Sequence, residues 1–217
     1  EIAKALQKCK VVIIDSHGCT SSKIHEGYDG SIYPLSSYIC LQTRAGISDS
    51  EMEYDTTNGY FQKYKHVFDG GTSRDYPNMH FWNVDGTAIK NHMTENAPNN
   101  FLWLTTCYGM RTDGLCRPLR AKGVGVVFGY TKSVTVAGDF RFQEHFWDAM
   151  VREDTTVAEA AAEMKQWVGV FDPCAESYDS AARPIFVSAE DSYPATAINA
   201  DSPSLNQEVK STWKLKS

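Results

Sequence analysis

Two short apolar runs in the sequence each end in a side chain that can take part in acyl-transfer chemistry. The first, VVIIDSHG, begins at Val11 and leads to His17, and the second, FLWLTTCYG, begins at Phe101 and leads to Cys107. If both runs are neighbouring parallel strands, an imidazole and a thiol meet at one edge of the sheet, where open α/β sheets build their sites. A thiol beside an imidazole is the layout of a cysteine nucleophile with a histidine acid/base.

The residues beside the pair fit the same chemistry. A thiol attacks a carbonyl only as its thiolate, and a helix beginning just after Cys107, together with a nearby imidazole, would favour that form. Gly18 lets the backbone approach a substrate closely, and its N–H together with that of Cys107 would hold a developing oxyanion. Tyr108 and Gly109 would form a tight exit from the strand. A lone cysteine at a strand end is more often a packing residue, but two strand ends that agree on one reaction favour catalysis.

Length and charge limit the class of protein. The chain has 217 residues, of which 42% are hydrophobic, enough to bury the core of one α/β domain. The net charge is −6, which argues against a nucleic-acid partner because phosphate binding needs clustered Lys and Arg. No apolar window is long enough to span a bilayer, so no membrane partner is expected. We therefore expect residues 1–217 to form a single domain.

The hydrophobic pattern predicts alternating strands and helices. We expect strands at 10–15, 37–44, 101–105, 123–130, 184–188 and 209–215, and helices at 1–8, 139–152 and 156–168. The continuous apolar run before His17 favours a strand covered on both faces. Asp139 is the expected cap of one helix, and Thr156 opens the next with a capping box, placing Trp167 on its core side. This order favours parallel crossovers and therefore an α/β fold.

Residues 51–100 differ in kind from the rest. They are polar, rich in Tyr, Asn, Asp and Gly, and poor in aliphatic residues, so we expect a polar insertion into the domain. Within it, Asp85 and Gly86 separate Phe81–Val84 from Thr87–Ile89, which predicts a two-residue hairpin turn.

The six cysteines show no ligand spacing. The chain is too large to need covalent staples, so we expect mostly free thiols, with one or two disulfides as the alternative. Cys9 and Cys40 are expected in the core. Neither CxxC motifs nor Cys/His pairs at finger spacing occur, and we expect no metal and no other cofactor.

Taken together, the two motifs resemble the double signature of the caspase-like cysteine peptidases of clan CD, which include caspases, metacaspases, legumains, gingipains, clostripains and separases. VVIIDSHG is similar to the histidine strand of caspases and FLWLTTCYG to the nucleophile strand. The resemblance implies that His17 is the general acid/base, that Cys107 is the nucleophile, and that the amides of Gly18 and Cys107 form the oxyanion hole. It further implies a three-layer αβα caspase-like sandwich with a mostly parallel central sheet, and a peptide or protein substrate.

The chain departs from the family pattern in three places. Thr106 replaces a small residue before the nucleophile, and Thr105 replaces an acid with which clostripain-like enzymes bind a basic P1 side chain. The two strands that the family places before the histidine strand are not found, so the sheet is expected to lack its N-terminal strands. Members of the clan often cleave themselves, so we expect that a segment preceding Glu1 has been removed. The cleaved N-terminal segment would then be a further partner of the chain.

The resemblance also places the walls of a substrate pocket, at Thr105, Tyr130, Thr131, Lys132 and Ser133. Asp15 and Asp139 would favour a basic P1 side chain, whereas Lys132 and Arg111 would favour an acidic one, and both possibilities stay open.

The predicted function is that of a cysteine endopeptidase that forms a thioester acyl-enzyme on Cys107. Two alternatives remain. One is a catalytically silent scaffold or peptide-binding module of the same fold. The other is a thiol-dependent amidase or transpeptidase that uses the same dyad with a different acceptor.

Overall fold

The computed structural model describes residues 1–20, 25–26, 32–33, 37–42, 62–64, 81–177, 180–194, 197 and 206–216. The elements in chain order are α1 (Ile2–Lys8), β1 (Val11–Asp15), β2 (His17–Thr20), β3 (His25–Glu26), β4 (Ile32–Tyr33), β5 (Ser37–Gln42), β6 (Gln62–Tyr64), β7 (Phe81–Val84), α3 (Gly86–Asn91), β8 (Phe101–Thr105), α4 (Cys116–Ala121), β9 (Val126–Tyr130), α5 (Val136–Met150), α6 (Val157–Val168) and β10 (Pro184–Val187).

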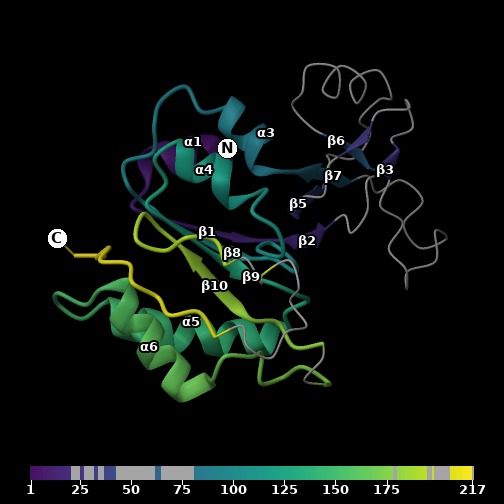
Figure 1. Cartoon of the computed structure of the whole chain (residues 1–217). Coiled ribbons are helices and arrows are strands. Elements are labelled where there is room, and N and C mark those ends of the chain that lie inside the picture. The colour runs from purple at the N-terminus through teal and green to yellow at the C-terminus, as the bar shows by residue number, and fades with distance from the viewer. Residues whose placement is uncertain are drawn as a thin grey trace.

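A four-stranded sheet with the order β1-β8-β9-β10 forms the centre of the molecule (Figure 1). β1 and β9 each pair with β8 in parallel, and β10 pairs with β9 antiparallel. All residues of β9 and β10 are buried, as are four of the five in β8, which explains their continuous apolar runs. The expected α/β class with a mostly parallel sheet is confirmed.

Helices cover the two faces of this sheet separately. One hydrophobic cluster joins the sheet to α1, α3 and α4, through residues such as Leu6, Ile89 and Leu119. The other joins the opposite face to α5 and α6, through residues such as Phe146 and Met164. Figure 1 shows the two groups of helices on either side of the strands. The result is an α/β sandwich with helices on both faces of the central sheet.

A second, antiparallel sheet has the order β2-β5-β7-β6. The chain passes from β1 directly into β2 with a bend at Ser16. In the second sheet His17 pairs with Cys40 of β5, whose predicted strand is thereby confirmed up to Gln42. Residues 43–44, the end of the predicted strand, lie outside the described residues. His17 therefore stands where the central sheet ends and the second sheet begins.

The predicted hairpin at residues 85–86 is wrong. Gly86–Asn91 forms helix α3, and the side chain of Asp85 caps it by accepting the Ala88 N–H at 2.8 Å. An ideal Cβ on Gly86 would lie 2.4 Å from the Leu115 carbonyl oxygen, so this glycine permits a close approach of two backbones. An Asp-Gly pair suits both a turn and a helix start, and burial of Ala88 and Ile89 decides for the helix.

The predicted cap of α5 is also wrong. Its N-cap is Thr135, whose hydroxyl accepts the Gly138 N–H at 2.9 Å, and Asp139 lies buried inside the first turn.

Three residues that were expected to be buried or covered are exposed. In β1 the expectation of a strand covered on both faces fails, since Ile13 is 48% exposed. Trp167 at the end of α6 is 65% exposed rather than in the core. Cys9 is exposed as well.

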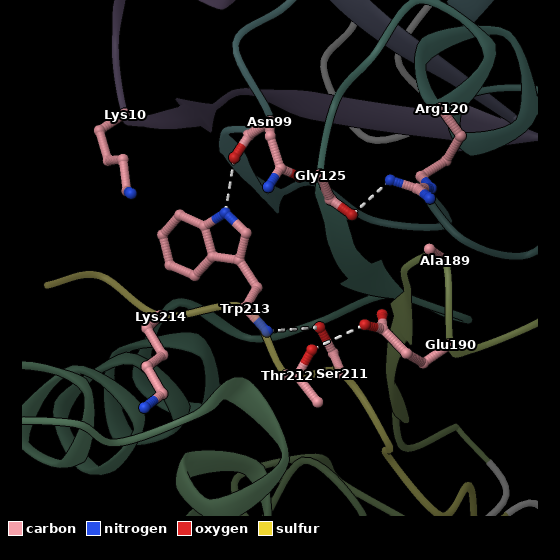
Figure 2. Close-up of a pocket in the computed structure, with 10 residues that line it drawn as sticks. All are labelled: Lys10, Asn99, Arg120, Gly125, Ala189, Glu190, Ser211, Thr212, Trp213 and Lys214. Atoms are coloured by element: carbon pink, nitrogen blue, oxygen red, sulfur yellow. Dashed lines mark hydrogen bonds between the residues drawn. The ribbon is translucent and has the colours of Figure 1, made fainter. Parts of the chain in front are cut away.

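Residues 209–215 do not form a strand. Apart from one bridge between Lys214 and Thr156, this segment pairs with helix ends and loops. The first-turn amides of α6, Val157 N and Ala158 N, donate to the carbonyls of Trp213 and Ser211 at 2.9 and 3.1 Å. The Trp213 indole N–H donates to the Asn99 carbonyl at 2.6 Å (Figure 2). The segment therefore satisfies the start of a helix instead of extending the sheet.

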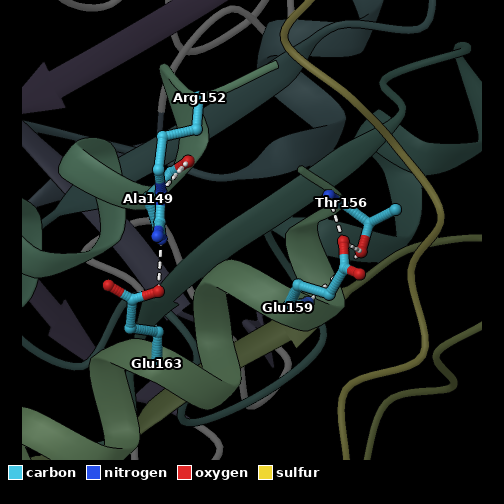
Figure 3. A network of polar contacts seen from close by, with 5 residues as sticks. All are labelled: Ala149, Arg152, Thr156, Glu159 and Glu163. Atoms are coloured by element: carbon cyan, nitrogen blue, oxygen red, sulfur yellow. Dashed lines mark hydrogen bonds and ion pairs between the residues drawn. The ribbon is translucent and has the colours of Figure 1, made fainter. Parts of the chain in front are cut away.

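The capping box of α6 is confirmed (Figure 3). The Thr156 hydroxyl accepts the Glu159 N–H at 3.2 Å, and the Glu159 carboxylate accepts the Thr156 N–H at 2.8 Å. Nearby, Arg152 forms an ion pair with Glu163, which links the end of α5 to α6.

Replacing Thr156 by alanine is expected to lower the free energy of unfolding by about 1 kcal/mol, because the Glu159 amide loses its acceptor. The measurement is urea denaturation of both proteins. Thr155→Ala, one residue earlier and outside the cap, is the matched control and should change stability by less than about 0.5 kcal/mol. Equal losses in the two variants would show that the cap is not the source of the effect.

Candidate active site

The ends of β1 and β8 lie side by side. The parallel register pairs Asp15 with Thr105, and the Ser16 N–H donates to the Thr105 carbonyl at 3.3 Å just beyond it. Two residues beyond this pair, His17 begins β2 and Cys107 lies in the turn after β8. The geometry thus places the two chemically reactive residues at one edge of the central sheet, at the carboxyl ends of its parallel strands.

Gly18 shows how closely the two segments approach. An ideal Cβ built on Gly18 would lie 2.1 Å from the Cys107 carbonyl oxygen and 2.8 Å from Thr106 Cβ. Only a residue without a side chain fits there. This contact fixes the backbone that follows His17 against the backbone of Cys107.

The chain turns sharply after Cys107. Tyr108 has a φ of 58°, a left-handed conformation that is uncommon outside glycine. Its N–H donates to the Lys132 carbonyl at 3.0 Å, and the Met110 N–H donates to the Tyr130 carbonyl at 2.9 Å. The turn is thus held against the end of β9. Strained backbone of this kind concentrates at functional sites.

A helix does not begin directly after Cys107. Residues 106–115 form turns, and α4 starts only at Cys116. The sequence suggested that the start of a helix just after Cys107 would favour the thiolate, and the structure has no helix start there.

Both reactive side chains reach the surface. His17 is exposed and Cys107 is partly exposed, with its Sγ 3.8 Å from the Val134 carbonyl oxygen. Val134 leads into α5, whose N-cap Thr135 is held by Asp172 through its backbone N–H at 2.7 Å and its hydroxyl at 3.1 Å. The thiol therefore lies against the loop that leads into α5, and the residue remains partly exposed.

The other described cysteines are less suited to be the nucleophile. Cys9, Cys107, Cys116 and Cys174 are free thiols. Burial raises the pKa of Cys116 to about 12, so its thiol stays protonated. Cys9 lies between α1 and β1, away from the strand ends that carry His17 and Cys107. The side chains of Cys19 and Cys40 lie outside the described part of the structure.

The nominated pocket residues differ in accessibility. Thr105 is partly exposed and Ser133 is exposed, whereas Tyr130, Thr131 and Lys132 are buried. The Thr131 hydroxyl accepts the Arg183 N–H at 3.2 Å. Thr105 and Ser133 are thus the members of this set that a substrate can touch most directly.

Asp139 and Gln143 form a polar network beside β8 that the sequence does not predict. Asp139 is expected as a helix cap and as a charge favouring a basic P1 side chain, yet its carboxylate accepts the Tyr130 hydroxyl at 2.6 Å. Gln143, one turn later in α5, donates through Nε2 to Asp139 at 2.6 Å and to the Thr105 hydroxyl at 3.2 Å. Burial, and then the Asp139 carboxylate, raise the pKa of Tyr130 well above its ordinary value, so the phenol remains a donor. The i, i+4 spacing of Asp139 and Gln143 is the sequence signal that could have linked them.

Charged side chains of both signs lie near the carboxyl end of β8. Asp139 and Asp172 are buried carboxylates, and Lys132 and Arg183 are buried cations on the neighbouring β9–β10 side. The exposed Asp15 adds one further negative charge. The described charges therefore favour neither a basic nor an acidic P1 side chain.

Within the described residues, no group of three or more His, Cys, Asp or Glu side chains could hold a metal ion. Likewise, no helix in this part of the chain is long and apolar enough to cross a membrane.

A cavity of about 380 Å³ lies at the other end of the sheet (Figure 2). Lys10, Asn99 and Gly125 line it, and each comes just before one of the parallel strands. Because parallel strands share their direction, this cavity lies opposite the edge that carries His17 and Cys107. Trp213 and Thr212 close it by hydrogen bonds to Asn99 and Glu190. These contacts indicate that the C-terminal segment is anchored there.

Comparison of the chain with models of protein families, with curated proteins and with solved structures finds no match. The function must therefore be inferred from the residues of the site and their geometry.

Proposed function

We propose that this protein is a cysteine endopeptidase of the caspase-like type. The Cys107 thiolate attacks the scissile carbonyl carbon, and the backbone amides of Gly18 and Cys107 stabilise the resulting oxyanion. His17 then protonates the leaving amine, which releases the first product and leaves a thioester on Cys107. Water, deprotonated by His17, hydrolyses the thioester and restores the free thiol.

The observation that carries the proposal is the contact between Gly18 and Cys107. It joins the end of the histidine-bearing strand to the end of the cysteine-bearing strand within a distance that only glycine allows, 2.1 Å from an ideal Cβ to the Cys107 carbonyl oxygen. The contact supports an acyl-transfer site because it holds the backbone after His17 against the backbone of Cys107. Base, nucleophile and oxyanion donors must all reach one carbonyl group, and this approach brings the segments that carry them together.

The finer fold assignment is part of the same proposal. A histidine and a cysteine at the carboxyl ends of adjacent parallel strands, with an antiparallel strand at the far edge of the sheet, support a caspase-like sandwich. In this arrangement Thr105 and Ser133 line the substrate pocket, and Tyr130, Thr131 and Lys132 support it from behind.

The alternatives make different demands on the dyad. A silent scaffold or peptide-binding module needs neither residue at the surface, yet both reach it. A transpeptidase or amidase would use the same thioester and differ only in the acceptor or in the substrate, so products must separate it from a peptidase.

The test is a peptide library varied at P1, incubated with the protein before and after alkylation by iodoacetamide and analysed by mass spectrometry. We expect two hydrolysis products from a subset of peptides and none after alkylation. Joined peptides would assign a transpeptidase, and release of ammonia alone would assign an amidase. Turnover that survives complete alkylation, or no turnover of any peptide, would overturn a thiol peptidase.

A further inference from the structure

Asp139 is the centre of a buried polar network beside the proposed nucleophile. It is 4% exposed, and its carboxylate accepts hydrogen bonds from three elements of the structure. The donors are the indole N–H of Trp103 in β8 at 3.3 Å, the hydroxyl of Tyr130 in β9 at 2.6 Å, and the Gln143 amide in α5 at 2.6 Å. One carboxylate therefore ties the helix to two strands.

A contribution to the stability of the fold does not readily explain why a carboxylate is buried at Asp139. The hydrogen bonds that its carboxylate accepts come from an indole, a phenol and an amide, which are neutral donors, and Asp139 lies in the first turn of α5. The surrounding cluster is apolar, with Phe142 and Phe146 on the same helix. A buried carboxylate in such a core is often no more stabilising than an apolar side chain of similar size.

The network leads to the strand end that carries the thiol. Gln143 donates with the same nitrogen to Asp139 and to the Thr105 hydroxyl at 3.2 Å. Thr105 is the last residue of β8, two residues before Cys107, and its carbonyl accepts the Ser16 N–H at 3.3 Å. Thr105 is thus bonded to α5 through its side chain and to the His17 segment through its backbone.

We propose that Asp139, acting through Gln143, is a positioning residue that fixes Thr105 and thereby sets the placement of Cys107 against His17 and Gly18. This inference rests on the proposed peptidase function. Asp139 does not touch the substrate. It orients the Gln143 amide so that one N–H meets the carboxylate and the other meets Thr105, and the strand end stays in register. A displacement of about 1 Å at a reacting group can lower a rate by about a hundredfold.

The main test variant is Gln143→Leu, which keeps the size of the side chain and removes both hydrogen bonds. Gln143 is partly exposed, so the variant should fold. With a peptide that the wild type hydrolyses, we expect kcat to fall about ten- to a hundredfold while KM changes less than about threefold. Gln166→Leu, the same change on an exposed position of α6, is the matched control and should leave both constants unchanged.

A second pair of variants tests Asp139 itself. Asparagine keeps an acceptor for Trp103 and Tyr130, and its amide can donate to a reoriented Gln143, whereas leucine removes the network. We therefore expect Asp139→Asn to recover most of the kcat that Asp139→Leu loses. Where Asp139→Leu fails to fold, Gln143→Leu decides alone.

The outcomes separate this inference from the proposed function. An active wild type with an unchanged kcat in Gln143→Leu overturns the positioning role and leaves the peptidase intact. A change in Gln143→Leu that is confined to KM also overturns the positioning role, since it would show a role in binding. A loss of kcat that is accompanied by a matching fall in melting temperature overturns it as well, since it would show a purely structural role. A wild type without thiol-dependent turnover overturns both.

Discussion

Replacing Cys107 by alanine is expected to abolish thiol-dependent peptide hydrolysis, with a rate at least about a thousandfold below that of the wild type. Without the sulfur no thioester forms, and neither His17 nor the backbone amides have a nucleophile to assist. The fold should survive, because Sγ is partly exposed and has only a 3.8 Å contact with the Val134 carbonyl. The measurements are the initial rate with the best library peptide and the melting temperature.

Cys174→Ala is the matched control, since Cys174 is also a free thiol at the surface. It should keep the wild-type rate. If Cys107→Ala retains activity while Cys174→Ala loses it, the nucleophile has been assigned to the wrong residue.

Replacing Gly18 by alanine is expected to lower kcat/KM by more than about a hundredfold. The added methyl group would lie 2.1 Å from the Cys107 carbonyl and 2.8 Å from Thr106 Cβ, so the two strand ends must separate. Separation moves His17 away from the thiol and disrupts the pair of oxyanion donors. Overpacking of this kind also lowers the free energy of unfolding, by about 1–3 kcal/mol.

Gly169→Ala distinguishes lost stability from lost geometry. Gly169 has a φ of 87° with no atom within 4 Å of an ideal Cβ, so alanine there introduces backbone strain without a clash. We expect it to destabilise the fold by about 1–3 kcal/mol and to leave kcat/KM unchanged. A loss of activity in Gly169→Ala as large as in Gly18→Ala would show that general destabilisation, not the contact with Cys107, accounts for the effect.

The central strands and the two long helices could be predicted because their sequences carry local signals. The apolar runs before His17 and Cys107 belong to strands whose side chains pack against helices, and Thr156 with Glu159 has the spacing that a capping box needs. Local patterns fail to predict the secondary structure where contacts with residues distant in the sequence determine it. Asp85 and Gly86 suit a turn as well as a helix start, and only burial of α3 against α4 selects the helix.

Residues 209–215 illustrate a different limit. The alternation of Val209, Trp213 and Leu215 with polar residues is typical of a strand, and these three side chains do pack against the core. Their backbone, however, supplies acceptors to the first turn of α6. Side-chain periodicity reports which residues face the core, but it does not report which backbone groups they meet.

For the candidate site, the reactive residues could be predicted from the sequence, but the contacts that hold them in place could not. His17 and Cys107 are recognisable by residue type and by position after apolar runs. The parallel pairing of the strands before them joins segments about 90 residues apart in the chain, and no local pattern encodes that contact. Asp139 is recognisable in the sequence as an acid near a helix start, but its bonds to Tyr130 and Gln143 are not, since a glutamine on a helix is ordinary.

If Cys107 is the nucleophile, it carries the acyl group during turnover. Intact-protein mass spectrometry after rapid acid quenching of the wild type mixed with a cleavable peptide, followed by peptide mapping, detects this intermediate. We expect a transient mass increase equal to the acyl half of the peptide, located on the fragment that contains Cys107 and absent from Cys107→Ala. Turnover with the acyl group on another residue, or an adduct that persists in Cys107→Ala, would contradict a Cys107 nucleophile.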